Sequence, residues 1–139
     1  MKIGVPKEIK THEYRVGLTP AGARELAMHG HQVIVERNAA YGIGISDDAY
    51  RVAGAAVVDS AAEVFAAAEL IVKVKEPQPA EIAMLRPGHV LFTYLHLAAD
   101  KAQTVALMHT GATCIASPPG PTADATDTPT PMVSASKTK

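Results

Sequence analysis

Bulky aromatic side chains are scarce in this sequence, and tryptophan is missing altogether. Aromatic residues make up 4% of the 139 residues, whereas hydrophobic residues as a whole make up 47%. A core of useful size can therefore form, but it has to be aliphatic, built from Val, Ile, Leu and Ala. The length allows one domain.

Disulfides, a strong charge of either sign and long apolar runs are also missing. Cys114 is the one cysteine, so no internal disulfide can form, which fits a reducing compartment. The formal net charge of -1 provides no basic field for nucleic acid or an anionic membrane surface. No apolar run approaches the ~20 residues that span a bilayer, and the first ten residues do not resemble a secretory signal. We expect a cytoplasmic protein with no nucleic-acid or membrane partner.

Short apolar runs alternate with helical stretches along most of the chain. Six runs predict strands at residues 2–5, 32–36, 55–58, 70–74, 90–94 and 112–116. Helices are expected between them: after Thr19 and Pro20, between Ser46 and Gly54, after a capping box of Ser60 and Glu63, and over residues 80–85 and 99–109. This alternation predicts an α/β fold, a doubly wound and mostly parallel sheet with helices on both faces.

The composition changes abruptly at Ser117. Residues 117–139 hold five of the ten prolines and five threonines, with little bulky apolar matter. Such a stretch buries too little surface to offset its ordering entropy. We predict a domain over residues 1–116 and an irregular or disordered tail over residues 117–139.

Three side chains that suit an anionic substrate follow predicted strands. Arg15 comes after the first strand, Lys75 after the fourth and His96 after the fifth. Ligands of open α/β sheets bind outside the carboxyl ends of the strands, so these groups are expected to converge at one edge. A guanidinium can clamp a carboxylate, an ammonium can polarise a carbonyl, and an imidazole can move a proton near neutral pH. This set suits a 2-oxo acid that undergoes reduction or imine chemistry.

Each candidate also has a simpler interpretation. Arg15 can be a solvated loop arginine, Lys73 and Lys75 can extend their ammonium groups to water, and His96 can be a hydrogen-bonded core histidine. Cys114 is interpreted as an inert buried thiol, and the remaining histidines show no metal-ligand pattern. The glycines at residues 42 and 44 do not form a phosphate loop, and no dinucleotide fingerprint occurs anywhere in the chain.

Several long blocks resemble the start of alanine dehydrogenases. They are MKIGVPKE at residues 1–8, EYRVGLTP at 13–20, GHQV at 30–33, LIVKVKEP at 70–77 and LFTYLHLAA at 91–99. The likeness is nearly unbroken from residue 1 to residue 116. It implies NAD-dependent, reversible oxidative deamination of L-alanine to pyruvate and ammonia. It also implies that Arg15 and Lys75 bind the substrate, that His96 is the catalytic acid and base, and that intact relatives are homo-oligomers with a separate Rossmann domain for NAD.

The likeness ends where the composition changes. Residues 117–121 read SPPGP in place of the family's Tyr-Glu-Thr segment, and the TPM at residues 130–132 has unmatched flanks. We expect a truncated chain, altered by a frameshift or premature stop, without an NAD-binding domain and inactive alone. Two alternatives are the N-terminal domain of a nicotinamide nucleotide transhydrogenase alpha subunit, against which the histidine at position 96 argues, and a non-catalytic fragment or interaction module.

Overall fold

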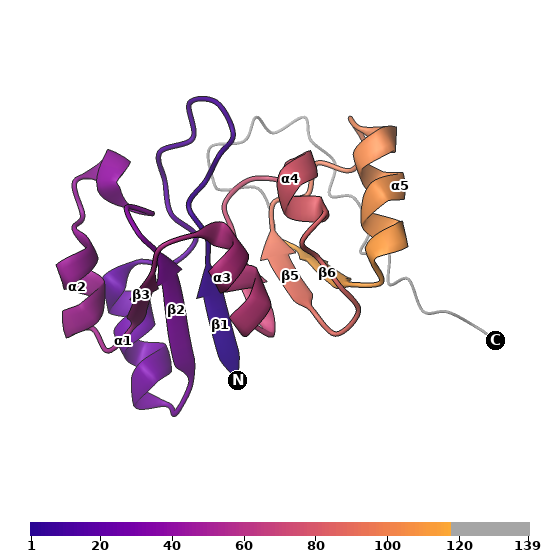
Figure 1. The fold of residues 1–139 in the computed structure, drawn as a ribbon. Helices are drawn as coiled ribbons and strands as arrows, with labels where there is room; N and C mark the ends of the chain where they lie inside the picture. The colour runs from indigo at the N-terminus through magenta and orange to yellow at the C-terminus, as the bar shows by residue number, and fades with distance from the viewer. Residues whose placement is uncertain (118–139) are drawn as a thin grey trace.

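The computed structural model describes residues 1–117, which form one six-stranded sheet (Figure 1). The strand order is β3-β2-β1-β4-β5-β6, and every neighbouring pair is parallel. The strands are β1 (Lys2–Val5), β2 (Gln32–Glu36), β3 (Ala56–Val58), β4 (Leu70–Val72), β5 (Val90–Thr93) and β6 (Thr113–Ala116). The predicted doubly wound α/β fold is confirmed, with a sheet that is parallel throughout.

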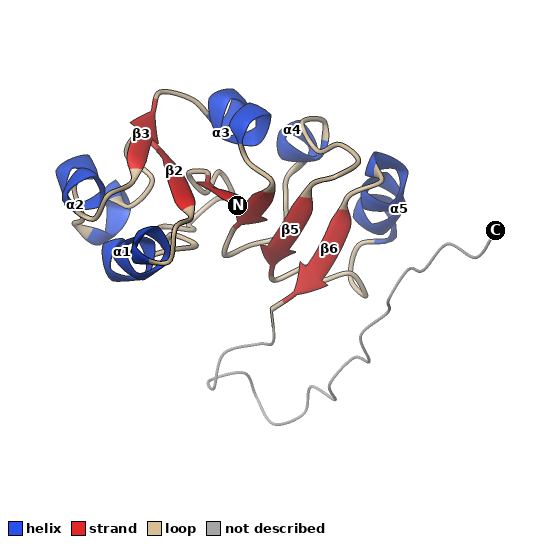
Figure 2. Cartoon of the chain, turned by 90° about the horizontal axis from the view of Figure 1, so that it is seen from below, coloured by secondary structure: helices blue, strands red, loops and turns tan. Residues whose placement is uncertain are grey.

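The helices lie on both faces of the sheet, as predicted. They are α1 (Pro20–Met28), α2 (Asp47–Val52), α3 (Ala61–Ala67), α4 (Pro79–Ile82) and α5 (Lys101–Thr110), with a 3-10 turn η1 (Tyr41–Ile43). Figure 2 shows α3, α4 and α5 along one face and α1 and α2 on the other, near the β3 end. Within residues 1–117, no helix is long and apolar enough to cross a bilayer.

Side-chain caps determine where most of these helices begin. Thr19, Ser46, Ser60 and Asp100 each accept a hydrogen bond from a backbone N–H of the following first turn, which would otherwise be unpaired. Because Asp100 is the cap, α5 begins at Lys101 and not at residue 99 as predicted. The other predicted helix starts agree with the structure to within a residue.

Two strands end earlier than predicted. β4 stops at Val72, because the Val74 N–H donates to the Glu8 carboxylate at 2.7 Å and not to a neighbouring strand. β5 stops at Thr93. The chain therefore leaves the sheet earlier at these ends, and the residues that follow form the loops of the carboxyl edge.

Successive side chains of a strand point to opposite faces of the sheet, so the core consists of two clusters, one on each face. Ile34 packs with Val64, Phe65 and Leu91 on the α3 side, whereas Val33 and Val35 pack with Ala23 and Tyr50 on the α1 side. Apart from the two rings of Phe65 and Tyr50, the fully buried hydrophobic side chains are aliphatic, as the composition predicts. The tail predicted for residues 117–139 lies, beyond Ser117, outside the described residues.

The long loop between β1 and α1 touches the backbone at the end of β4. A Cβ atom at Gly17 would lie 2.5 Å from the Val72 carbonyl oxygen and 3.0 Å from the Lys73 Cα. Backbone atoms in a sheet cannot withdraw as a flexible side chain can, so only glycine fits there. This contact holds the loop that carries Arg15 against the strand that precedes Lys75.

We predict that Gly17→Ala destabilises the chain by about 2 kcal/mol, because overpacking against fixed atoms costs ~1–3 kcal/mol. Urea unfolding of the 139-residue chain measures this change. Gly22→Ala is the matched control. The one close neighbour of a Cβ at Gly22 is the movable end of the Leu18 side chain, and alanine favours the helix by up to ~1 kcal/mol. Equal effects of the two substitutions would contradict the close contact at Gly17.

Candidate functional site

The structure places all three predicted site residues in loops at the carboxyl edge of the sheet. Arg15 lies in the β1–α1 loop, Lys75 follows β4 and His96 follows β5. β1, β4 and β5 are adjacent strands, and they are parallel. Parallel strands end at the same edge, so the three residues emerge side by side along it.

Tyr94 connects Lys75 with His96. The Lys75 ammonium nitrogen lies over the Tyr94 ring, 5.7 Å from its centroid, which is a cation–π arrangement. The Tyr94 hydroxyl is hydrogen-bonded to Nδ1 of His96 at 3.0 Å. His96 is exposed, so it is not a histidine of the core. Its φ of 48° is in the left-handed region, which few residues other than glycine adopt.

Glu13 is the ion-pair partner of Arg15. Nε and Nη2 of Arg15 donate to the two Glu13 carboxylate oxygens at 2.8 and 2.6 Å. These bonds are the largest cause of a Glu13 pKa lowered to about 2, and the nearby charge of Lys75 lowers it further. The Glu13 side chain is 6% exposed and that of Arg15 is 63% exposed, so the guanidinium faces solvent. Arg15 stays charged, because its pKa is raised by the same pair.

This arrangement leaves donors for an anion. In the described part of the chain, Glu13 occupies Nε and Nη2 of Arg15, whereas Nη1 has no hydrogen-bond partner. Lys75 makes its ring contact with Tyr94, and no acceptor for its ammonium group is found among residues 1–117. Each cation therefore keeps a donor for an incoming carboxylate or carbonyl, and the Arg15–Glu13 pair need not break.

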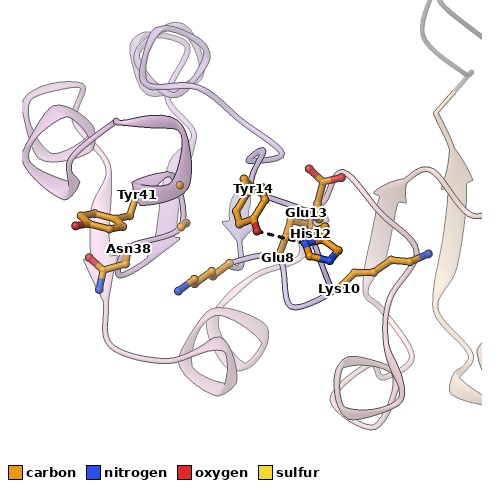
Figure 3. A pocket seen from close by; sticks show the side chains of 10 residues that line it. Glu8, Lys10, His12, Glu13, Tyr14, Asn38 and Tyr41 are labelled. Carbon is orange, nitrogen blue, oxygen red and sulfur yellow. Dashed lines mark hydrogen bonds between the residues drawn. The ribbon is translucent and has the colours of Figure 1, made fainter.

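An open depression of about 540 Å³ lies beside these residues, over the ends of β1 and β2 (Figure 3). Its wall includes Glu13 and the exposed rings of Tyr14 and Tyr41. Arg15, Lys75 and His96 do not line this depression, although Glu13 belongs to both groups. The three predicted residues are therefore not brought together around this depression.

Several residues of this edge escaped the sequence analysis. The simpler interpretation, in which Lys73 extends to water, is wrong: its side chain is fully buried and pairs with Glu8 and Glu81. A charged residue within the apolar run LIVKV was the available signal, since a lysine is buried only when it is paired. Tyr94 and Glu13 are each two positions from a predicted site residue, yet nothing in their spacing indicated their contacts.

Three other titratable groups with shifted pKa values lie in or against the core. Burial raises the pKa of Tyr50 to about 12, and its hydroxyl donates to the Leu18 carbonyl at 2.7 Å. Burial lowers the pKa of His89, which is held between Arg86 and the Phe65 carbonyl. Burial also raises the pKa of Cys114, a half-buried thiol, which fits its interpretation as unreactive.

The described residues offer no fit for a metal ion or for NAD. Among residues 1–117, no group of three or more His, Cys, Asp or Glu side chains is placed to hold a metal. A dinucleotide pyrophosphate needs a short glycine-rich turn from a strand into a helix. β1 leads instead through Pro6 into a long loop that ends at Thr19, the cap of α1.

The fold and this edge define an α/β domain with two cations and an imidazole in loops at the carboxyl edge of its parallel sheet. The chain belongs to the alanine dehydrogenase/PNT N-terminal domain family, whose model matches residues 4–128.

Relatives within this family agree with the fold and with the blocks noted in the sequence. The chain is 58% identical to an alanine dehydrogenase of Halomonas elongata and 51% identical to one of Mycolicibacterium smegmatis, in each case over 116 residues. These alignments cover 84% of this chain and 31% of each relative, so the chain spans about a third of their length.

Solved structures show the same fold. A structure of L-alanine dehydrogenase matches with a TM-score of 0.81 and 51% identity, covering 84% of this chain and 32% of that one. A transhydrogenase from Sinorhizobium meliloti matches with a TM-score of 0.78 and 30% identity, covering 84% of this chain and 34% of that one. The higher identity is to the alanine dehydrogenase.

We predict that Arg15→Met raises the Glu13 pKa from about 2 toward the ordinary 4.5, because it removes the largest cause of the lowering. NMR of the Glu13 side-chain carbonyl carbon across acidic pH measures this change. In wild type the lowered pKa of Glu13 stabilises the fold at pH values above the pKa that Glu13 has in the unfolded chain. This contribution is lost as the pH falls toward 2. Arg51→Met, which removes the exposed partner of Asp48, should leave Glu13 unchanged. An unaltered Glu13 titration in Arg15→Met would contradict the pairing.

Proposed function

We propose that this chain is the substrate domain of an L-alanine dehydrogenase, an NAD-dependent enzyme of reversible oxidative deamination. One observation supports this most directly: Lys75 and His96 both contact Tyr94, and the Arg15–Glu13 pair lies in another loop at the same edge of a fold of this family. These are the residues that the family resemblance assigns to substrate binding and proton transfer. The chain therefore holds the groups that meet L-alanine or pyruvate.

Each side chain has a role that its contacts suit. Arg15 binds the substrate carboxylate, and Nη1 is the nitrogen that Glu13 leaves unoccupied. Lys75 donates to the carbonyl oxygen of pyruvate, or to the carboxylate, from its position over Tyr94. His96 is the acid and base, with Nδ1 engaged by the Tyr94 hydroxyl and Nε2 left for the proton that moves.

In a complete L-alanine dehydrogenase of the kind proposed, NAD accepts or returns the hydride. The described residues do not fit a dinucleotide, so no hydride step is assigned to them. Their part is to bind and orient the substrate and to hold the proton. Homo-oligomers and a cytoplasmic location belong to the same proposal, by analogy with the family.

The transhydrogenase alternative and the non-catalytic alternative differ from this proposal in the side chains that they require at the carboxyl edge of the sheet. Neither requires an acid and base at His96 or an arginine free to receive a carboxylate. The identities of 58% and 51% to alanine dehydrogenases, against 30% to the transhydrogenase structure, favour the amino-acid substrate. Binding of pyruvate distinguishes the three.

We predict that the 139-residue chain binds pyruvate weakly and that Arg15→Met weakens binding about tenfold or more. A hydrogen bond to a charged group contributes ~1.5–3 kcal/mol, and 1.4 kcal/mol corresponds to a factor of ten. NMR titration with pyruvate measures the dissociation constants. His96→Ala should weaken binding less, because its proposed role is to move a proton.

Arg51→Met is the matched control for this titration. Arg51 is an exposed arginine that pairs with a near neighbour at 2.6 Å, as Arg15 does. It lies on α2, away from the carboxyl edge of β4 and β5. Equal affinities of wild type, Arg15→Met and Arg51→Met for pyruvate would rule out the proposed role of Arg15.

We also predict that the 139-residue chain forms no NADH from L-alanine and NAD, because its sequence contains no G-x-G-x-x-G turn to hold the pyrophosphate. Absorbance at the nicotinamide band follows the reaction, with an authentic alanine dehydrogenase as the positive control. Turnover above the enzyme-free blank that depends on L-alanine would refute this prediction.

A further inference from the structure

A lysine and two glutamates are buried together beneath the candidate site. The Lys73 ammonium group donates to Glu8 Oε2 at 3.0 Å and to Glu81 Oε1 at 2.7 Å. The side chain of Lys73 is 0% exposed, and those of Glu8 and Glu81 are 2% exposed. Nothing in the proposed chemistry uses these three charges, so their burial calls for another reason.

Each of the two carboxylates also holds the backbone after β4. The second oxygen of Glu8 accepts from the Val74 N–H at 2.7 Å, and that of Glu81 accepts from the Gln78 N–H at 2.8 Å. Residues 73–78 belong to no helix or strand. Two buried side chains thus supply hydrogen bonds to this segment that regular secondary structure would otherwise provide.

Stability alone does not explain such a cluster. Taking three charges out of water is costly, and well-packed apolar side chains of similar volume often stabilise a fold as well or better. Directional hydrogen bonds differ from apolar packing in that they fix the relative position of the groups they join. Here they join three segments: the β1–α1 loop with Glu8, the end of β4 with Lys73, and α4 with Glu81.

The segment between these anchors carries Lys75. The carbonyl of Lys75 accepts a hydrogen bond from the buried hydroxyl of Thr93 at 2.7 Å. The backbone is therefore held before Lys75, after Lys75 and at Lys75 itself. The Lys75 side chain extends from this held backbone over the Tyr94 ring. The loop with Glu8 continues to Arg15, so the same network also holds the other cation's loop.

We propose that Lys73, Glu8 and Glu81 form a positioning network that fixes the Lys75 ammonium group over Tyr94 and sets its place relative to Arg15. This inference rests on the proposed function for the statement that the two cations bind substrate. The geometric part, that the network sets the position of Lys75, stands on the contacts alone and can be measured without a ligand.

NMR of the ε-methylene group of Lys75 in the 139-residue chain, labelled with ¹³C-lysine, reports its position. Protons over the face of a tyrosine ring resonate upfield, so the Lys75 signal should lie upfield of that of the exposed Lys101, and Tyr94→Leu should abolish the difference. Glu8→Gln keeps the shape and an acceptor for the Val74 N–H but no longer pairs with an ammonium. We expect it to reduce the upfield displacement about twofold or more, because a loosened support misplaces the group it holds.

Glu69→Gln is the matched control. Its carboxylate also accepts a backbone N–H from a distant segment, that of Lys2, but at the opposite edge of the sheet. It should leave the Lys75 signal in place. If Glu8→Gln does not fold, Glu81→Gln, which changes the other carboxylate of the network, provides the same test. A Lys75 signal without upfield displacement in the wild type would overturn the proposal, and so would an unchanged displacement in folded Glu8→Gln or Glu81→Gln.

Pyruvate titration of the same variants separates this inference from the proposed function. If the network positions a binding cation, Glu8→Gln weakens pyruvate binding about tenfold while Glu69→Gln does not, since small displacements of binding groups have large effects. A wild type that shows the Lys75 displacement but binds no pyruvate would refute the proposed substrate and leave the positioning role intact. Pyruvate binding that is equal in wild type and folded Glu8→Gln, with the Lys75 signal unmoved, would refute the positioning role alone.

Discussion

The approach of Gly17 to the end of β4 is the contact on which the arrangement of the site depends. A parallel sheet brings the carboxyl ends of β1, β4 and β5 to one edge, but it does not say where a long loop from β1 will lie. The missing side chain at Gly17 lets that loop rest directly on the backbone of Val72 and Lys73. From there Arg15 reaches Glu13, and the charge of Lys75 acts on the same carboxylate.

The fold was predictable because its signals are local. Apolar runs, helix caps such as Ser46 and Ser60, and glycines such as Gly111 at helix ends follow from single positions and their neighbours. The edge at which Arg15, Lys75 and His96 emerge follows from the parallel topology. Their contacts were not predictable, because Tyr94, Glu13 and Gly17 act through distances that only the folded chain sets. Lys73 was misread for the same reason: its two partners are 65 and 8 residues away in the sequence.

Charge is distributed unevenly between the surface and the interior of this edge. Arg15 and His96 are exposed and Lys75 is half-buried, whereas the charged side chains buried beneath them include Lys73, Glu8 and Glu81. A site for an anion needs cations at its mouth, yet cations crowded together repel one another. Buried carboxylates below the loops, together with Glu13 beside Arg15, offset that repulsion and leave the outward-facing donors available.

The position of β1 in the middle of the sheet has a consequence for how the chain acquires its structure. β1 is made first, but it pairs with β4 through contacts such as the Glu69 N–H to the Lys2 carbonyl, across almost seventy residues. During synthesis, one side of this apolar strand has no partner until β4, almost seventy residues further along, has left the ribosome. Such distant pairings slow folding, and until they form, the strand KIGV presents an open edge to other chains in the cell.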